Sequence, residues 1–164
     1  MFVASFPLIS FAQGAPNLKE FPPTDLDKFI NNTKAVSSTG IDFVVDPPPR
    51  PYLFEGVLAE KPTEWPEGAN IIEAGYRARF SPVSGETVKY ALKIISKKGR
   101  TVSFHLQNIT AKSILDEINL KGEECCVGNR IEVYARYIYN MHGEVGLYAV
   151  WVVTHQRGEK NPPG

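Results

Sequence analysis

The chain has 164 residues, a formal net charge of zero, 43% hydrophobic residues and 22% charged residues. A chain of this length suits one domain with an appendage rather than two ordinary domains, and its composition excludes global disorder. No run approaches the ~18 consecutive apolar residues that a membrane-spanning helix needs.

Residues 1–14 form an apolar, uncharged segment, since the first charged side chain is Lys19. The small residues Ser10 and Ala12 follow the apolar run with the spacing found before a signal-peptide cleavage site, although the usual basic start is missing. We expect either a signal peptide, which would make the protein periplasmic or secreted, or an apolar arm that packs on its own or a neighbouring subunit. In the second case the protein would be cytoplasmic.

Residues 15–50 are predicted to form an N-terminal extension with one short helix. Thr24 followed by Asp27 resembles a capping box at a helix start, and the helix would end near Ala35. Apolar side chains at positions i, i+3 and i+4 give this helix one face to dock, and they are Leu26, Phe29 and Ile30. A Pro-rich linker at 46–49 would separate the extension from the main domain.

The main domain is predicted over residues 51–157, with a flexible tail at 158–164. Runs with the period of two that a half-buried strand shows lie at 52–61, 87–96 and 101–107, with a further strand-like run at 76–80. In the third run, Val102, Phe104 and Leu106 alternate with Ser103 and His105.

After these runs the period changes to that of a helix at 110–120, with Thr110 or a neighbour as its cap and Gly122 at its end. A strand hairpin follows at 129–155. In its second strand, the alternation predicts one face made of Val145, Leu147, Ala149, Trp151 and Val153.

The order of three strands, one helix and two further strands resembles the small exported bacterial OB-fold domains. The residues that carry the resemblance most directly are Gly128-Asn129-Arg130-Ile131-Glu132-Val133, at the start of the hairpin. The resemblance implies a mostly β fold: a five-stranded barrel with one helix between strands 3 and 4, joined to an N-terminal arm with a short helix.

The resemblance also implies a position for a ligand, because OB-folds bind on the outer face of their second and third strands and on the flanking loops. The region 76–112 that would form this face has eight basic residues and one acidic residue. The predicted ligand-binding residues are Arg77, Arg79, Lys89, Lys93 and His105 on the face, with Trp65 and His142 at its rim. A solvated strand face with lysines for solubility explains the same charge equally well.

The two cysteines, Cys125 and Cys126, are adjacent. A disulfide between neighbours would be strained, so we expect one buried and one exposed thiol, or a bridge between chains that would link a homo-oligomer. A metal site formed by this pair with His142 or His155 would need ligands from separate loops. We therefore predict no metal, no cofactor and, because no catalytic motif is found, no enzyme activity.

Three functions fit these predictions. The first is an exported, non-enzymatic OB-fold module that binds an anionic glycan, a peptide or an envelope partner on its basic strand face. The second is a single-stranded nucleic-acid-binding protein of a phage or mobile element. The third is a structural or assembly subunit that uses the arm before residue 50 to contact its neighbours.

Overall fold

The computed structural model describes residues 17–36, 50–65, 89–141 and 144–156. Several predictions lie outside the described residues, namely those for 1–14, the linker at 46–49, the run at 76–80, the tail at 158–164, Arg77, Arg79 and His142.

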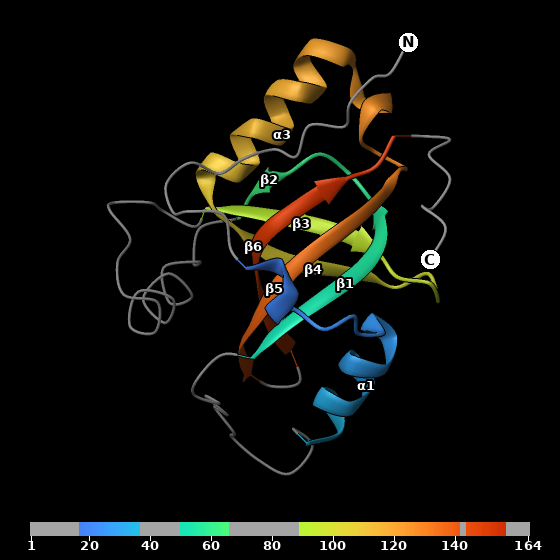
Figure 1. Ribbon diagram of the computed structural model, residues 1–164, viewed down its shortest axis with the longest axis vertical. Helices are drawn as coiled ribbons and strands as arrows, with labels where there is room; N and C mark the ends of the chain where they lie inside the picture. Colours follow the sequence, from blue (N-terminus) through green and yellow to red (C-terminus); the bar gives the residue numbers. More distant parts are fainter. Residues whose placement is uncertain (1–16, 37–49, 66–88, 142–143, 157–164) are drawn as a thin grey trace.

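The described strands form one sheet that closes into a barrel (Figure 1). They are β1 (Pro51–Leu58), β2 (Thr63–Glu64), β3 (Tyr90–Ile95), β4 (Thr101–Leu106), β5 (Arg130–Met141) and β6 (Glu144–Thr154). The ring runs β1-β5-β6-β4-β3 and returns to β1, while β2 extends the sheet from β3. The β4–β6 pairing is parallel and the other ring pairings are antiparallel.

Helix α3 (Asn108–Lys121) connects β4 to β5, the third and fourth strands of the ring in chain order. This strand order and helix position confirm the predicted OB-fold-like barrel. The helix packs Ile114 and Ile118 into the barrel core, and it ends where predicted, at Gly122 with φ +88°. Its N-cap is Gln107, which makes no side-chain capping bond and lies three residues before Thr110, which with its neighbours was the predicted cap.

The barrel core contains the alternate side chains that each strand turns inward. Fully buried members include Phe54, Leu92, Phe104, Ile131 and Leu147. The alternation seen in the sequence therefore predicted the inward faces of β3 and β4 correctly.

Strand β6 departs from its predicted alternation because it contains a β-bulge. Tyr134 pairs with Trp151, but the next residue, Ala135, pairs with Ala149, so Val150 is left over. Ala149 faces the core, whereas Trp151 belongs to a separate cluster outside the barrel. One extra residue thus reverses the inside and outside positions for the rest of the strand.

Helix α1 (Leu26–Val36) begins with a different cap from the predicted Thr24. The Asp25 carboxylate accepts a hydrogen bond from the backbone N–H of Lys28 at 2.8 Å, while the Thr24 hydroxyl donates to the Pro22 carbonyl at 3.0 Å. Asp25 therefore caps the helix, one residue later than expected.

Asp27 connects α1 to the turn between β3 and β4. Its carboxylate is buried and accepts hydrogen bonds from the Ser96 hydroxyl at 2.8 Å and from the Lys98 backbone N–H at 3.1 Å. The Arg100 guanidinium lies 3.7 Å from the same carboxylate. The residue that the sequence suggested for a capping box therefore joins two distant elements.

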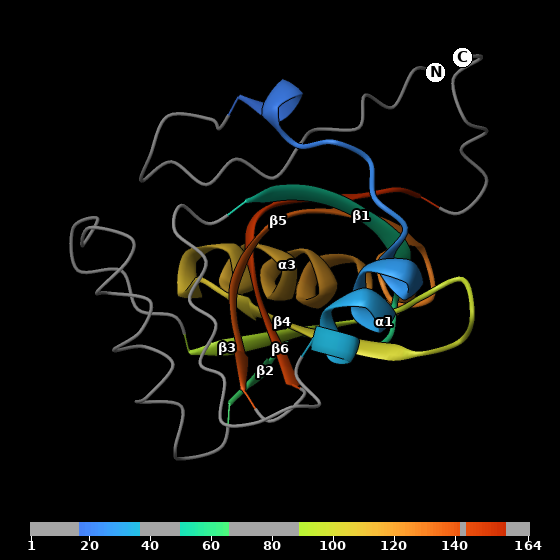
Figure 2. The same cartoon turned by 90° about the horizontal axis from the view of Figure 1, so that it is seen from below.

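The segment before α1 lies along the outside of the barrel (Figure 2). After the short helix η1 (Leu18–Glu20), backbone bonds join Pro22 and Thr24 to Leu53 of β1 at 2.9 and 2.8 Å. Phe21 is 3% exposed and packs edge-on against Tyr134, with ring centroids 5.6 Å apart. The described part of the arm thus packs on the barrel of its own chain.

Candidate ligand-binding face

On the outer side of β3 and β4, one row of side chains points away from the barrel core. Cross-strand register aligns Thr63 of β2 with Ala91 of β3, Ala91 with His105 of β4, and His105 with Tyr148 of β6. This row lies at the position where OB-folds bind oligonucleotides and oligosaccharides.

Trp65 covers this row, because its indole stacks on the imidazole of His105. The ring centroids are 4.7 Å apart and the planes differ by 27°. The indole Nε1–H donates to the Tyr90 carbonyl at 2.9 Å, and the Trp65 backbone N–H donates to the Lys89 carbonyl at 2.8 Å. The half-buried indole is thus held in one orientation on the outside of the barrel.

His105 lies at the outward strand position that was predicted, but it is only 3% exposed. Burial lowers the pKa of its imidazole from 6.5 to about 4. The ring is therefore neutral at pH 7. His105 cannot be the exposed cationic contact that the sequence suggested. Instead, its ring packs against the indole of Trp65 and supports it.

The two described lysines of the face differ in their surroundings. Lys89 is exposed at the start of β3, next to Trp65 across the strand pair. Lys93 Nζ lies 2.7 Å from a carboxylate oxygen of Glu60, and both side chains are partly exposed. An ion pair of this kind contributes little to stability, and it can be exchanged for a ligand anion.

The opposite side of the barrel exterior is already occupied. Phe21 and Leu18 of the N-terminal segment pack against Tyr134 of β5 and Trp151 of β6. The guanidinium of Arg136 lies 5.4 Å from the centre of the Phe21 ring. The short segment before α1 therefore packs on β5 and β6 and not on the β3–β4 row, of which Ala91, His105 and Tyr148 are nonetheless buried.

The sequence did not show that Trp65 and His105 form a stacked pair. They are 40 positions apart, and β2, which places Trp65 beside β3, is only two residues long. The signal that could have found it was a tryptophan next to a short run in the loop after the first ring strand, which is a framing loop of OB-fold sites.

Comparisons with known proteins add little to this description. No family model and no curated protein matches the chain. Among solved structures, the chain is similar to that of the second single-stranded DNA-binding protein (SSBb) from Mycobacterium smegmatis, with 15% identity and a TM-score of 0.38. The match covers 69% of this chain and 98% of that one. The fold assignment rests on the strand order described above.

None of the helices in the described part of the chain is long and apolar enough to cross a membrane.

Proposed function

We propose that this protein is a non-enzymatic OB-fold binding module whose outer β3–β4 face binds an anionic ligand with rings that stack on an aromatic side chain. The observation that carries the proposal is the half-buried indole of Trp65, held against His105 on the outer side of β3 and β4. Single-stranded oligonucleotides combine negative charge with flat bases, and acidic oligosaccharides combine it with puckered sugar rings whose C–H faces also pack on aromatic side chains.

The fixed orientation of Trp65 favours binding because little side-chain freedom remains to be lost when a ligand stacks on it. Its Nε1–H bond and its contact with His105 restrict both side-chain torsions. Stacking of a ring on such an aromatic side chain contributes roughly 1–3 kcal/mol per base in single-strand binding proteins.

The charge on the described face supports modest affinity rather than tight binding of a polyanion. Lys89 is exposed and can approach a ligand anion directly, whereas Lys93 must first release Glu60. For a single-stranded nucleic acid, one or two such contacts predict a weak dependence on salt, with a log–log slope of about −0.7 per contact.

Tryptophan fluorescence tests the proposal directly. The chain has two tryptophans, so Trp151→Phe leaves Trp65 as the sole reporter. This protein is titrated in parallel with oligothymidylate and with oligogalacturonate, at two salt concentrations. We expect one of the two ligand classes to quench Trp65 at saturable concentrations, and the class that does so identifies the ligand chemistry.

Variants then separate stacking from charge. Trp65→Ala, followed by calorimetry, should weaken binding at least roughly fivefold, since ~1 kcal/mol is the low end of the stacking contribution. Lys89→Glu should weaken binding and reduce its salt dependence. Lys112→Glu, at an exposed position of α3, is the matched control and should bind as the parent protein does. Equal binding by all three variants would contradict the proposed face.

Export is a separate part of the proposal, because the site does not depend on it. Its support is the pattern of residues 1–14, and its test is the N-terminal sequence of the protein isolated from its native host. A mature start near Gln13 or Ala15 is expected, and an intact Met1 would remove export from the proposal.

A further inference from the structure

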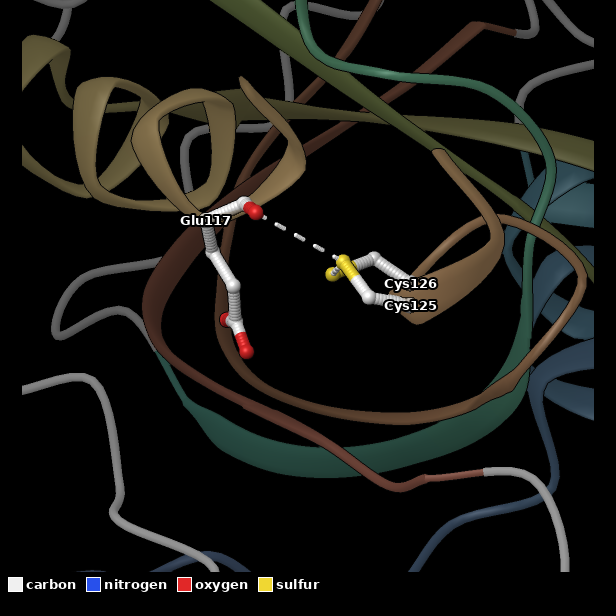
Figure 3. Close-up of side chains that lie close together, drawn as sticks. All are labelled: Glu117, Cys125 and Cys126. Atoms are coloured by element: carbon white, nitrogen blue, oxygen red, sulfur yellow. Dashed lines mark hydrogen bonds between the residues drawn. The ribbon is translucent and has the colours of Figure 1, made fainter. Parts of the chain in front are cut away.

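A second group of reactive side chains lies at the end of α3 and shares no residue with the proposed binding face. Figure 3 shows Glu117 of α3 next to Cys125 and Cys126, which follow the helix in the short turn η3 (Glu123–Cys125) and directly after it. The Sγ atoms of the two free cysteines are 2.7 Å apart, and Cys125 Sγ donates to the Glu117 carbonyl at 3.8 Å. Both sulfurs and a carboxylate oxygen of Glu117 lie within 4.8 Å of one another.

The turn that carries the cysteines is held in place by hydrogen bonds. The side-chain amide of Asn129, which is 5% exposed, donates to the carbonyl of Cys125 at 2.7 Å and to that of Glu124 at 3.3 Å. The backbone N–H of Cys126 donates to the Glu123 carbonyl at 3.1 Å. The two thiols are therefore positioned beside the helix before any ligand arrives.

We propose that Glu117, Cys125 and Cys126 form a binding site for a thiophilic divalent cation, with Zn²⁺ as the physiological candidate. Two thiolates and one carboxylate are ligands that Zn²⁺ accepts, and three protein ligands leave a fourth tetrahedral position for water. Glu117 belongs to a different element from the cysteines, so no spacing in the sequence groups these three donors.

The site needs only a small adjustment to hold the ion. With Zn–S bonds of about 2.3 Å and tetrahedral angles, the two sulfurs would stand about 3.8 Å apart. They must therefore separate by about 1 Å from their present 2.7 Å, which a rotation of the half-buried Cys125 side chain allows. The Lys121 ammonium, 3.1 Å from one Glu117 oxygen, leaves the other oxygen of that carboxylate for the metal.

A disulfide fits the same pair less well. Neighbouring Cα atoms are about 3.8 Å apart, below the usual lower limit of about 4.4 Å for bridged cysteines. Chelation places no such demand on the Cα separation, whereas a disulfide would have to bring the sulfurs from 2.7 Å to about 2.05 Å across this short Cα distance. The backbone geometry therefore favours a shared metal over a bond between the two cysteines.

Metal binding at this site must release protons. Burial, the hydrogen bond with Cys125 and the charge of Glu117 raise the pKa of Cys126 to about 12, so its thiol is protonated at pH 7. The balanced step is one Zn²⁺ plus two thiols giving a Zn-dithiolate and two protons, with the carboxylate as third ligand. The apparent affinity should therefore rise with pH.

The test uses the full-length reduced protein with Zn²⁺ and, as a spectroscopic probe, Cd²⁺. Competition with a chromophoric chelator measures Zn²⁺ affinity, the ultraviolet thiolate-to-Cd²⁺ charge-transfer band reports sulfur ligation, and calorimetry in two buffers counts protons. We expect one ion per chain, a thiolate band and release of protons on binding. Glu117→Gln should lose at least roughly tenfold in Zn²⁺ affinity, because even outer-shell partners of metal sites contribute that much.

Glu124→Gln is the matched control, since this exposed neighbour in the same turn should leave the affinity unchanged. Cys125→Ser changes a half-buried residue, and circular dichroism establishes that this variant is folded before its loss of binding is interpreted. The proposal is overturned if the parent protein binds no stoichiometric ion, if Cys125→Ser binds equally well, or if Glu117→Gln is unaffected. The proposal would also be overturned if Cys125 and Cys126 readily formed a disulfide and the reduced protein bound neither Zn²⁺ nor Cd²⁺.

Discussion

The burial of His105 beneath Trp65 predicts that the protein loses stability as the pH falls from about 6.5 to about 4. In the unfolded chain a histidine takes up its proton near pH 6.5, whereas His105 in the folded protein does so at about 4. Between these two values the unfolded state binds more protons, so acid favours unfolding. Above pH 7 and below pH 4 this residue adds no further pH dependence.

The size of the effect follows from the same two pKa values. At about 1.4 kcal/mol per pKa unit, the gap between 6.5 and about 4 corresponds to roughly 3 kcal/mol of lost stability at pH 4. That is a large part of the 5–15 kcal/mol by which a domain is typically stable, so the loss should be visible in any unfolding titration.

The assay compares the parent protein with His105→Phe, which keeps an aromatic ring under Trp65 but cannot be protonated. Urea unfolding of both proteins at pH 7, 5.5 and 4 gives the free-energy difference between them at each pH. The other two histidines are present in both proteins and cancel in that difference. The variant should gain roughly 3 kcal/mol relative to the parent on going from pH 7 to pH 4.

A pH-independent difference between the two proteins would refute this reasoning. So would an NMR titration in which the His105 ring protons shift near pH 6.5 in the folded protein. Trp65→Ala provides an internal check, because removing the indole exposes the imidazole. It should move the pKa of His105 back towards 6.5 and reduce the dependence on acid.

Three further changes test the fold by urea unfolding at pH 7. Asp27→Ala leaves the turn between β3 and β4 without its buried acceptor and should cost roughly 2–4 kcal/mol, whereas a cost below 1 kcal/mol would show that this link is unimportant. Gly56→Ala places a methyl group 2.7 Å from the Ile95 carbonyl and should cost about 1–3 kcal/mol, so an unchanged midpoint would contradict the close approach of β1 and β3. Phe21→Ala removes the ring that packs on Tyr134 and should cost about 3 kcal/mol, and limited proteolysis should then cut the N-terminal segment faster than in the parent.

The barrel could be predicted from the sequence because its signals are local. The alternation of Val102, Phe104 and Leu106 with their polar neighbours, the change of period at α3 and the glycine that ends the helix each act over a few residues. The resemblance drawn from the order of these elements then gave the connectivity of the ring, since few topologies accommodate this order in so short a chain.

The predictions that were wrong concern contacts between residues that are distant in the sequence. The extra residue Val150 in β6 can be recognised only once the pairing of Tyr134 with Trp151 is known. The alternation around His105 correctly indicated an outward position, yet an outward position is exposed only if nothing covers it. Here the cover is Trp65, brought from another strand.

The strand pairings that close the ring differ in length. β1 pairs with β5 over seven residue pairs, but with β3 over only two, Val57 with Ile95 and Leu58 with Ile94. Fewer backbone hydrogen bonds must therefore break to separate β1 from β3, and Gly56 lies directly beside this pairing. The β4–β6 pairing also has only two residue pairs, so the described ring has two short pairings, and the one between β1 and β3 is the one that lies beside Gly56. Local opening of the native state at the β1–β3 pairing would reach the loop that carries Trp65, because this loop begins at the end of β1.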